Sequence, residues 1–375
     1  MSSRVLIAGG GVGALEAALA LRDLAGDRVE VLIYSPREDF VYRPFAVAEP
    51  YGASRGMRYD LRSLAERCEA TFYRGGIASV DGERQRARTH DGEEVPYEHL
   101  ILACGSRLLA GVPGAVTFWG VADDARVLDV VGDLRERRLR RAVFTMPGGG
   151  TWALPMYELA LLAERELTKA GVEDASLTIV TPEDSPLHLF GLGASRRVGE
   201  LLAARGIEVV AGATPVKFES GVLTLSPSAE VPTDAVLSLP HIQGRQIGGI
   251  PHDPNGFVAV DEYCRIRGMR RAFAVGDVTS FPVKQGGIAT QQADVAAEAI
   301  AAELGCDAPA EALDPMLRGV LWTGAEPLYL SGYLAGGRGE TSIASDRPPW
   351  EGAEEDKIVG RYLTPFLDHG SRSAA

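Results

Sequence analysis

The sequence predicts an α/β protein in which one parallel-sheet unit occurs twice. In the first copy, an apolar run at 4–8 ends in a glycine-rich turn, apolar residues recur at helical spacing over 15–24, and a second apolar run covers 29–34. Strand, tight turn, helix and strand within about 30 residues are the pattern of a β-α-β unit. The second copy repeats strand, turn, helix and strand at 142–146, 148–150, 154–170 and 176–180.

Further runs extend these two units. Between 58 and 106, a helix at 61–67 precedes turn signals at Gly75-Gly76, Asp81-Gly82 and Asp91-Gly92, which predict an inserted antiparallel meander before a buried strand at 100–104. Other helices and strands are expected at 195–205, 207–210, 272–275 and 286–304. The first domain is predicted to have two parts, at 1–112 and 241–312. The second domain lies between them at 113–240, and a C-terminal cap follows at 313–375.

Composition narrows the class of protein. The chain has 375 residues, 38 basic and 51 acidic, so its net charge of −13 argues against a nucleic-acid-binding protein, which needs a positive field. No run approaches the roughly 18 apolar residues of a membrane-spanning helix, which leaves at most peripheral membrane contact. The four cysteines show no C-x-x-C spacing and predict a reducing cytoplasm, and the six histidines show no metal-ligand spacing, so no metal site is expected.

The first glycine turn fits the pattern G-x-G-x-x-A over Gly9-Gly10-Gly11-Val12-Gly13-Ala14. In this pattern the first glycine makes the turn, the second lets a pyrophosphate approach the backbone, and the small third residue packs helix on strand. The free N–H groups of the helix start then face phosphate. With a strand before it and a helix after it, the turn predicts a dinucleotide site, with contacts from Gly9, Gly11, Val12, Gly13 and Ala14.

The end of the second strand departs from this pattern. An acidic residue is expected there to hold the adenosine ribose, and this chain has Tyr34-Ser35-Pro36 instead. Ser35 can still hydrogen-bond a hydroxyl, and Glu38 lies nearby. The departure weakens the ribose assignment but leaves the pyrophosphate assignment intact.

Two later segments complete a resemblance to a known family. Leu100-Ile-Leu-Ala-Cys-Gly-Ser106 and Phe273-Ala-Val-Gly-Asp277 resemble the second and third signatures of the two-dinucleotide-domain flavoproteins, the pyridine nucleotide-disulfide oxidoreductase superfamily. Phe40-Val-Tyr-Arg-Pro44 is similar to the segment that passes the flavin in one branch of this superfamily. That branch contains sulfide:quinone oxidoreductase, flavocytochrome c sulfide dehydrogenase and type II NADH dehydrogenase. The resemblance implies two Rossmann-like, three-layer dinucleotide-binding domains with FAD as cofactor, a meander inserted in the first, and a small C-terminal cap.

The resemblance also implies which residues contact FAD. Besides the first turn, these are Tyr34, Ser35, Arg43, Pro44, Ala103, Cys104, Gly105, Gly276 and Asp277. Cys104 stands where the family usually has threonine. Asp277, at the carboxyl end of a strand, can accept hydrogen bonds from ribityl hydroxyls, although an aspartate there can also cap a turn or helix.

A long helix is expected to begin directly after Lys284. Its first residues, Gln285, Gly286, Gly287 and Ile288, present free N–H groups and a positive dipole that would stabilise negative charge on a reduced flavin. Lys284 would add charge there or be a solvated loop lysine. We take Pro44, Lys284 and His241 as catalytic candidates, with His241 either a proton donor or a loop histidine without catalytic duty.

The second glycine turn is harder to interpret. Gly148, Gly149, Gly150 and Thr151 occupy the position of a loop that binds NAD(P)H, and Glu158 and Glu183 are the nearest acids. Bulky Trp152 lies in the turn, and Pro155 must stand at the start of the following helix because proline disrupts a helix interior. The alternatives are NAD(P)H binding and a domain retained for folding or for another donor.

These features together predict an FAD-dependent oxidoreductase that passes two electrons from a small-molecule donor, for which NAD(P)H is a candidate, to a quinone or similar acceptor. Relatives that oxidise sulfide need a cysteine pair near the flavin, and neither Cys104 nor Cys264 lies at the family's catalytic position. A sulfide or thiol dehydrogenase without that pair, and a non-catalytic flavin-bearing sensor or partner-binding protein, remain alternatives. We expect a cytoplasmic homodimer, with an apolar stripe over 358–367 that docks on the body or on a second subunit.

Overall fold

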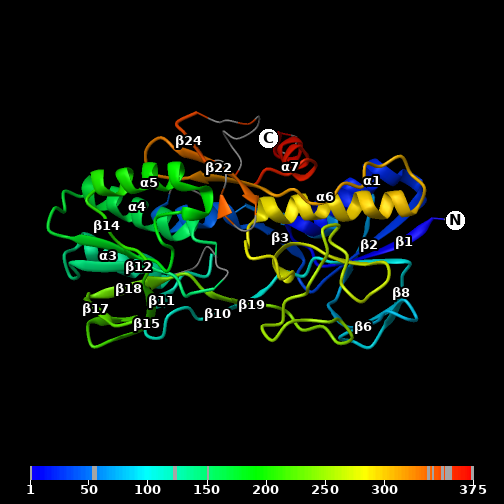
Figure 1. Cartoon of the computed structure of the whole chain (residues 1–375), viewed down its shortest axis with the longest axis horizontal. Coiled ribbons are helices and arrows are strands. Elements are labelled where there is room, and N and C mark those ends of the chain that lie inside the picture. The colour runs from blue at the N-terminus through cyan, green and yellow to red at the C-terminus, as the bar shows by residue number, and fades with distance from the viewer. Residues whose placement is uncertain are drawn as a thin grey trace.

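Two five-stranded parallel sheets organise the chain (Figure 1). The computed structural model describes residues 2–52, 57–120, 125–149, 152–335, 338–339, 342–347, 350 and 357–372. The first sheet has the strand order β20-β9-β1-β2-β5, and every neighbouring pair is parallel. Its strands are Ala272–Ala274 (β20), His99–Leu102 (β9), Ser3–Ala8 (β1), Val29–Ser35 (β2) and Thr71–Arg74 (β5). This is the order of a Rossmann-like sheet.

The second sheet also has five strands, and four of them repeat the order of β9-β1-β2-β5 while β11 takes the edge position. Its strands run in the order β11-β18-β12-β13-β14, again all parallel. They are Val116–Thr117 (β11), Ala235–Ser238 (β18), Arg141–Thr145 (β12), Ser176–Val180 (β13) and Glu208–Val210 (β14). The predicted α/β class with two Rossmann-like units is therefore confirmed.

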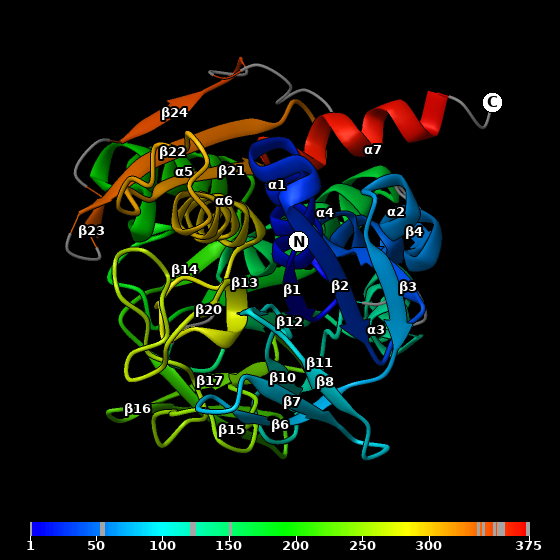
Figure 2. The same ribbon diagram turned by 90° about the vertical axis from the view of Figure 1, so that its right-hand side faces the viewer.

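Each sheet has helices on one face and an antiparallel meander on the other (Figure 2). In the first unit, Val5 and Ile7 of β1 pack with α1 (Val12–Ala25) and α6 (Gly286–Glu303). The alternate residues Leu6 and Ala8 pack with the meander. Successive side chains on a strand point to opposite faces, so both faces of β1 are apolar. The first meander is Ile77–Asp81 (β6), Arg86–Thr89 (β7) and Glu94–Pro96 (β8).

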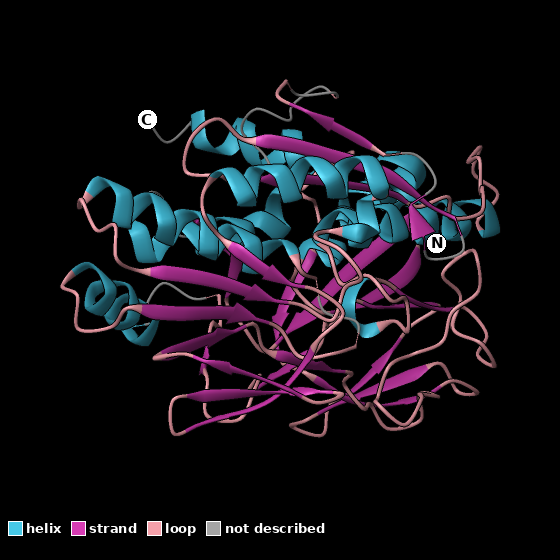
Figure 3. Cartoon of the chain, turned by 60° about the vertical axis from the view of Figure 1, so that its left-hand side comes forward, coloured by secondary structure: helices cyan, strands magenta, loops and turns pink. Residues whose placement is uncertain are grey.

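The second unit has the same three layers, as Figure 3 shows by element type. Its helices are Ala125–Arg135 (α3), Leu154–Lys169 (α4) and Leu192–Ala204 (α5). Its meander is Thr214–Glu219 (β15), Val222–Ser226 (β16) and Ala229–Pro232 (β17), and Leu223 and Leu225 pack against Val143 and Val236 of the sheet. The turn signals in the sequence predict only the first meander.

Shorter elements join the two units. Arg107–Leu109 (β10) pairs with His241–Gln243 (β19) where the chain passes between the sheets and returns. Asp39–Tyr42 (β3) pairs with Met57–Asp60 (β4), and a 3₁₀ segment at Arg43–Tyr51 follows β3. Leu61–Arg67 (α2) agrees with the predicted helix at 61–67.

The C-terminal cap is a small antiparallel sheet followed by one helix. Its strands are Met316–Leu321 (β21), Leu328–Ala335 (β22), Arg338–Gly339 (β23) and Ile343–Ser345 (β24). Helix α7 (Leu363–Arg372) carries only some residues of the predicted stripe, because Ile358 to Tyr362 precede it as non-helical chain. Ile358, Leu363 and Leu367 are buried in the same core as α1, so these members of the stripe dock on the body. No helix within the described ranges is both long and apolar enough to cross a bilayer.

Candidate functional site

A cavity of about 920 Å³ opens between the two units. That volume lies in the upper region of the range typical of cofactor and small-molecule sites. Its walls come from the carboxyl end of the first sheet, the start of α6, the start of α4 and the C-terminal segment. The sequence-predicted residues that line it are Gly9, Gly11, Val12, Gly13, Tyr34, Ser35, Arg43, Pro44, Ala103, Cys104, Gly105, Glu158, Gly276, Asp277, Lys284, Gln285 and Gly286.

The first glycine turn forms one end of this cavity. Gly9 has φ +138°, and a Cβ built on it would lie 2.1 Å from the Ala103 carbonyl oxygen. A Cβ built on Gly11 would meet no protein atom within 4 Å. Gly11 is also the N-cap of α1 and offers no side chain to the first-turn N–H groups. The turn therefore leaves space and free donors for a phosphate group, as the fingerprint requires.

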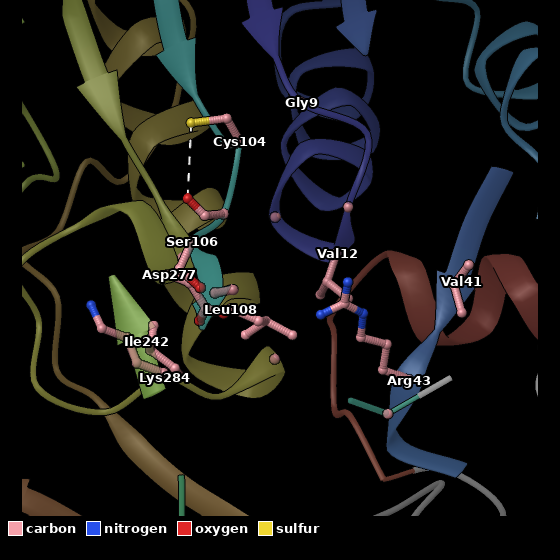
Figure 4. A pocket seen from close by; sticks show the side chains of 18 of the residues that line it. Gly9, Val12, Val41, Arg43, Cys104, Ser106, Leu108, Ile242, Asp277 and Lys284 are labelled. Atoms are coloured by element: carbon pink, nitrogen blue, oxygen red, sulfur yellow. Dashed lines mark hydrogen bonds between the residues drawn. The ribbon is translucent and has the colours of Figure 1, made fainter. Parts of the chain in front are cut away.

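Asp277 and Lys284 lie on the opposite side of the cavity from Arg43 (Figure 4). No described residue donates a hydrogen bond to the Asp277 carboxylate, so it is available to ligand hydroxyls. Burial raises its pKa, and the positive charges of Lys284 and Arg43 oppose that rise. Burial lowers the pKa of Lys284 to about 8, against the attraction of Asp277 and Asp253. An unpartnered carboxylate beside a helix start fits the ribityl chain of FAD.

Lys284 is held in place by its own loop. Its Nζ donates to the Thr279 carbonyl and lies 4.0 Å from the centre of the Phe257 ring. Gln285 caps α6 by accepting the Ile288 N–H at 3.0 Å, and its amide donates to the Arg318 carbonyl of β21. The start of α6 is thereby tied to the C-terminal sheet.

Only one of the four cysteines lines the cavity. Cys104 follows β9, and burial raises the pKa of its thiol to about 11. Cys68 and Cys264 are buried elsewhere, Cys306 lies outside the cavity wall, and all four are free thiols. A thiol with so high a pKa is mainly protonated at neutral pH and is a weak nucleophile.

A buried ion pair forms another section of the wall. Lys357 Nζ contacts Glu158 Oε1, and these side chains are 5% and 1% exposed. The same Nζ donates to the Pro44 carbonyl at 3.3 Å and lies 4.3 Å from the centre of the Trp322 ring. The Trp322 backbone N–H donates to Glu158 at 2.8 Å. This pair joins α4, the 3₁₀ segment after β3 and the C-terminal segment at one point.

A second cavity of about 340 Å³ lies at the carboxyl ends of β12 and β13. Glu183 lines it, and its Oε2 accepts from Tyr157 Oη at 2.7 Å and Thr181 Oγ1 at 3.0 Å. Burial raises the pKa of Glu183, and these hydrogen bonds oppose the rise. Trp152 lines both cavities and therefore separates them. Pro155 lies in the first turn of α4, as predicted.

Several predicted residues lie elsewhere. His241 is on β19, but its neighbours Pro240 and Ile242 line the cavity and it does not. Ile242 and Gln243 of the same strand contribute to the cavity wall instead. Ala14, Gly287 and Ile288 are buried in packing rather than at the cavity wall. Gly148 and Gly149 line neither cavity, Glu158 belongs to the Lys357 pair, and Gly150 and Thr151 fall outside the described residues.

Sequence reasoning missed a large share of the wall. Missed residues include Arg37, Phe118, Trp119, Ile242, Arg245, Gly319, Val320, Lys357 and Ile358. Arg37 follows β2, and Phe118 and Trp119 follow β11. The others belong to the β10–β19 crossing and to the C-terminal cap, which no local motif places near the first turn. In the portion of the chain that the structure describes, no group of three or more metal-binding side chains gathers.

Gly9 and Gly11 make a matched test of FAD binding at the first turn. Gly11→Ala should leave the thermal unfolding of the FAD-free protein nearly unchanged, because the added methyl meets no protein atom. It should weaken FAD binding at least about tenfold, since the methyl enters the space for the pyrophosphate. Gly9→Ala should destabilise the fold itself. Calorimetry and FAD fluorescence titration measure both, and FAD affinity unchanged in Gly11→Ala contradicts the assignment.

The Glu158–Lys357 pair makes a second prediction. Lys357→Met leaves a buried carboxylate without its partner and should lower the free energy of unfolding by about 3–5 kcal/mol. Combining it with Glu158→Gln should recover most of that loss. The Glu166–Lys169 pair, whose lysine is exposed, is the control, and Lys169→Met should cost about 1 kcal/mol or less. Urea unfolding provides the values, and equal losses for Lys357 and Lys169 would refute the argument.

Comparison with known proteins identifies the family. The sequence profile described as pyridine nucleotide-disulphide oxidoreductase matches residues 3–300. The chain is 26% identical over 304 residues to the sulfide-quinone reductase of Aquifex aeolicus, covering 75% of this chain and 70% of that protein. It is 28% identical over 289 residues to the ferredoxin–NAD(+) reductase component of the anthranilate 1,2-dioxygenase system of Burkholderia cepacia, covering 73% and 67%.

A solved structure agrees with this result. The X-ray structure of the sulfide:quinone oxidoreductase from Aquifex aeolicus matches with a TM-score of 0.80 and 22% identity, covering 92% of this chain and 87% of that one. At that identity the match establishes the fold. The family profile covers most of the chain, and the cavity offers a phosphate turn and an unpartnered aspartate that fit a dinucleotide cofactor. The chain therefore belongs to the pyridine nucleotide-disulphide oxidoreductase family and is an FAD-dependent oxidoreductase.

Proposed function

We propose that the protein transfers two electrons from a reduced nicotinamide dinucleotide, through FAD, to a quinone or similar small acceptor. The observation that carries this proposal is the shared wall at Trp152, between the FAD cavity and the cavity at the end of β13. Nucleotides bind parallel sheets at the carboxyl ends of the strands. The second cavity is thus where the donor nucleotide would lie, next to the cofactor.

Glu183 supports a nicotinamide donor and favours NADH over NADPH. It lies just beyond the end of β13, where the dinucleotide fingerprint uses an acid to hold the adenosine ribose. The hydrogen bonds from Tyr157 and Thr181 fix its carboxylate at the cavity wall. A carboxylate in that position attracts a ribose hydroxyl and repels the additional phosphate of NADPH.

When bound, FAD supplies the electron-transfer chemistry, and the residues of the chain orient it and stabilise negative charge on it. The N-terminus of α6 and Lys284 place positive charge at one end of the cavity, where it favours negative charge on a ligand. Glu158 and Lys357 are a buried acid and base at the same cavity, and they can hold or deliver a proton for an acceptor. Phe118, Trp152 and Val320 give the cavity apolar walls that suit a quinone ring.

The proposal also covers the location and the oligomeric state of the protein. We infer a cytoplasmic homodimer that makes at most peripheral membrane contact. The reducing-compartment pattern of four unpaired cysteines supports the location. The apolar walls of the cavity suit small molecules as electron donor and electron acceptor.

Anaerobic titration separates the proposed donor from the others. NADH should bleach the flavin absorbance faster than NADPH. In Glu183→Gln the NADH preference should fall about tenfold, because the repelling charge is gone while a hydrogen-bond acceptor remains. Asp184→Asn, on the same cavity, is the matched control and should keep the preference. Slow bleaching by both nucleotides would overturn the donor assignment, and slow reduction by every donor would favour the sensor alternative.

Sulfide oxidation is the second candidate, and the relationship to a sulfide-quinone reductase favours it. With one protonated cysteine at the cavity, we expect sulfide to bleach the flavin at least about tenfold more slowly than NADH, a barrier difference of about 1.4 kcal/mol or more. Rapid bleaching by sulfide that is lost in Cys104→Ser but kept in Cys264→Ser would establish this candidate instead. Stopped-flow absorbance at the flavin band measures each rate.

A further inference from the structure

The C-terminal residues Lys357 to Leu363, here called the strap, close one side of the FAD cavity. Lys357 and Ile358 line the cavity, and Ile358 covers Gly286 at the start of α6 so closely that a Cβ on Gly286 would lie 2.5 Å from its side chain. The Ile358 N–H donates to Tyr42 Oη at 3.0 Å. The strap therefore bridges β3 and α6 across the cavity wall.

The strap is anchored on a side chain of α1, one helical turn beyond Gly13 at the cavity wall. Glu16 is fully buried, and its two oxygens accept the backbone N–H groups of Tyr362 and Leu363 at 2.9 and 2.7 Å. Leu363 begins α7, so Glu16 caps that helix from outside its own chain segment. Gly360 passes so close that a Cβ on it would lie 2.7 Å from Glu16 Oε2.

A second carboxyl group lies against this anchor. Asp294 of α6 hydrogen-bonds the Glu16 carboxyl, and its Oδ1 is buried without a hydrogen-bond partner among the described residues. Two carboxylates in contact repel each other unless one of them carries a proton. Burial and the adjacent Glu16 raise the pKa of Asp294 to about 8, and burial also raises the pKa of Glu16. Because both Glu16 oxygens already accept backbone N–H groups, Asp294 holds the shared proton and Glu16 remains the acceptor.

Among the described residues, one cation acts on the Glu16–Asp294 pair. Arg361 is the cation that faces it, and its guanidinium is exposed and 3.6 Å from Glu298 of α6. Tyr362 Oη donates to Asp23 of α1 at 3.1 Å. The titratable groups that act on Asp294 besides Glu16 are Arg361 of the strap and Glu298 of α6. Behind them, Asp23 of α1 lies against Tyr362, and Glu311 of the loop after α6 lies against Glu298. Loss of the shared proton therefore adds a negative charge for which the described residues offer no cation beyond Arg361.

We propose that Glu16 is a positioning residue that holds the strap closed over the FAD cavity, and that Asp294 makes this closure depend on one shared proton. Opening the strap exposes Asp294 to water and lets it ionise readily. The closed strap binds one proton more than the open strap at every pH between the two pKa values of Asp294. Raising the pH in this interval favours opening, and the effect levels off above about pH 8, where the closed form has also lost the proton.

Trypsin can measure this opening because the strap contains Lys357 and Arg361. Cleavage after either residue needs local release of the strap and reports the open population. The FAD-loaded protein is digested between about pH 6.5 and 9, fragments are identified by mass spectrometry, and rates are normalised to cleavage of the free peptide KIVGRYL. We expect the rate to rise up to about tenfold per pH unit towards pH 8 and then to level off. FAD release, followed by fluorescence, should show the same profile.

Variants distinguish the effect of the Glu16–Asp294 pair on the strap from a general loss of stability. Asp294→Asn keeps a donor to Glu16 without a titratable proton and should be cut slowly at every pH. Glu16→Gln should be cut at the low end of the pH range at least as fast as the wild type at its high end. Gly360→Ala, which pushes the strap from Glu16 without changing any charge, should raise cleavage at every pH. Glu303→Gln, on α6 but bound to His99 and Arg265, is the matched control and should behave as the wild type.

Three results would overturn the proposal. One is a normalised cleavage rate in the wild type that does not change with pH. Another is a pH profile in Asp294→Asn equal to that of the wild type. The last is faster cleavage in Glu303→Gln equal to that in Glu16→Gln, which would mean that any loss of charge on these helices loosens the chain.

Discussion

The close packing of α1 against α6 is the constraint on which the site depends. These helices begin far apart in the sequence, yet both N-termini open on one cavity. A Cβ on Gly13 would lie 3.1 Å from Val275 and 3.4 Å from the Ala289 carbonyl, so only a residue without a side chain fits without displacement. Small residues at this crossing let two helix dipoles act on the same ligand. The other walls of the cavity adjoin this crossing of α1 and α6.

The elements of the fold that were predicted correctly are those set by local patterns. The Gly9–Ala14 turn, the helix at 61–67 and Pro155 in the first turn of α4 each follow from a few neighbouring residues. The second meander, Ile242 rather than His241 at the cavity wall, and Lys357 at the cavity depend on pairings between distant segments. No local signal carries such contacts, so most of the missed site residues lie on the β10–β19 crossing and in the C-terminal cap.

The two units show how one architecture supports different sites. In the first, Gly11 leaves open space at the carboxyl end of the sheet, and Asp277 faces that space without a partner among the described residues. In the second, Trp152 fills the corresponding region and leaves a smaller cavity with Glu183 at its wall. The same strand-turn-helix order therefore gives a large cofactor cavity in one unit and a restricted pocket in the other. The difference lies in side-chain volume at the turn rather than in topology.

The position of the strap in the chain has a consequence for assembly in the cell. The glycine turn, the parallel strands and α6 precede Lys357 to Leu363 in the chain and leave the ribosome first, so the cavity stands open on that side until the strap docks. A nascent chain can then acquire its cofactor through a wide entrance, which narrows once the strap docks on Glu16. A chain interrupted before Lys357 would lack this wall of the cavity.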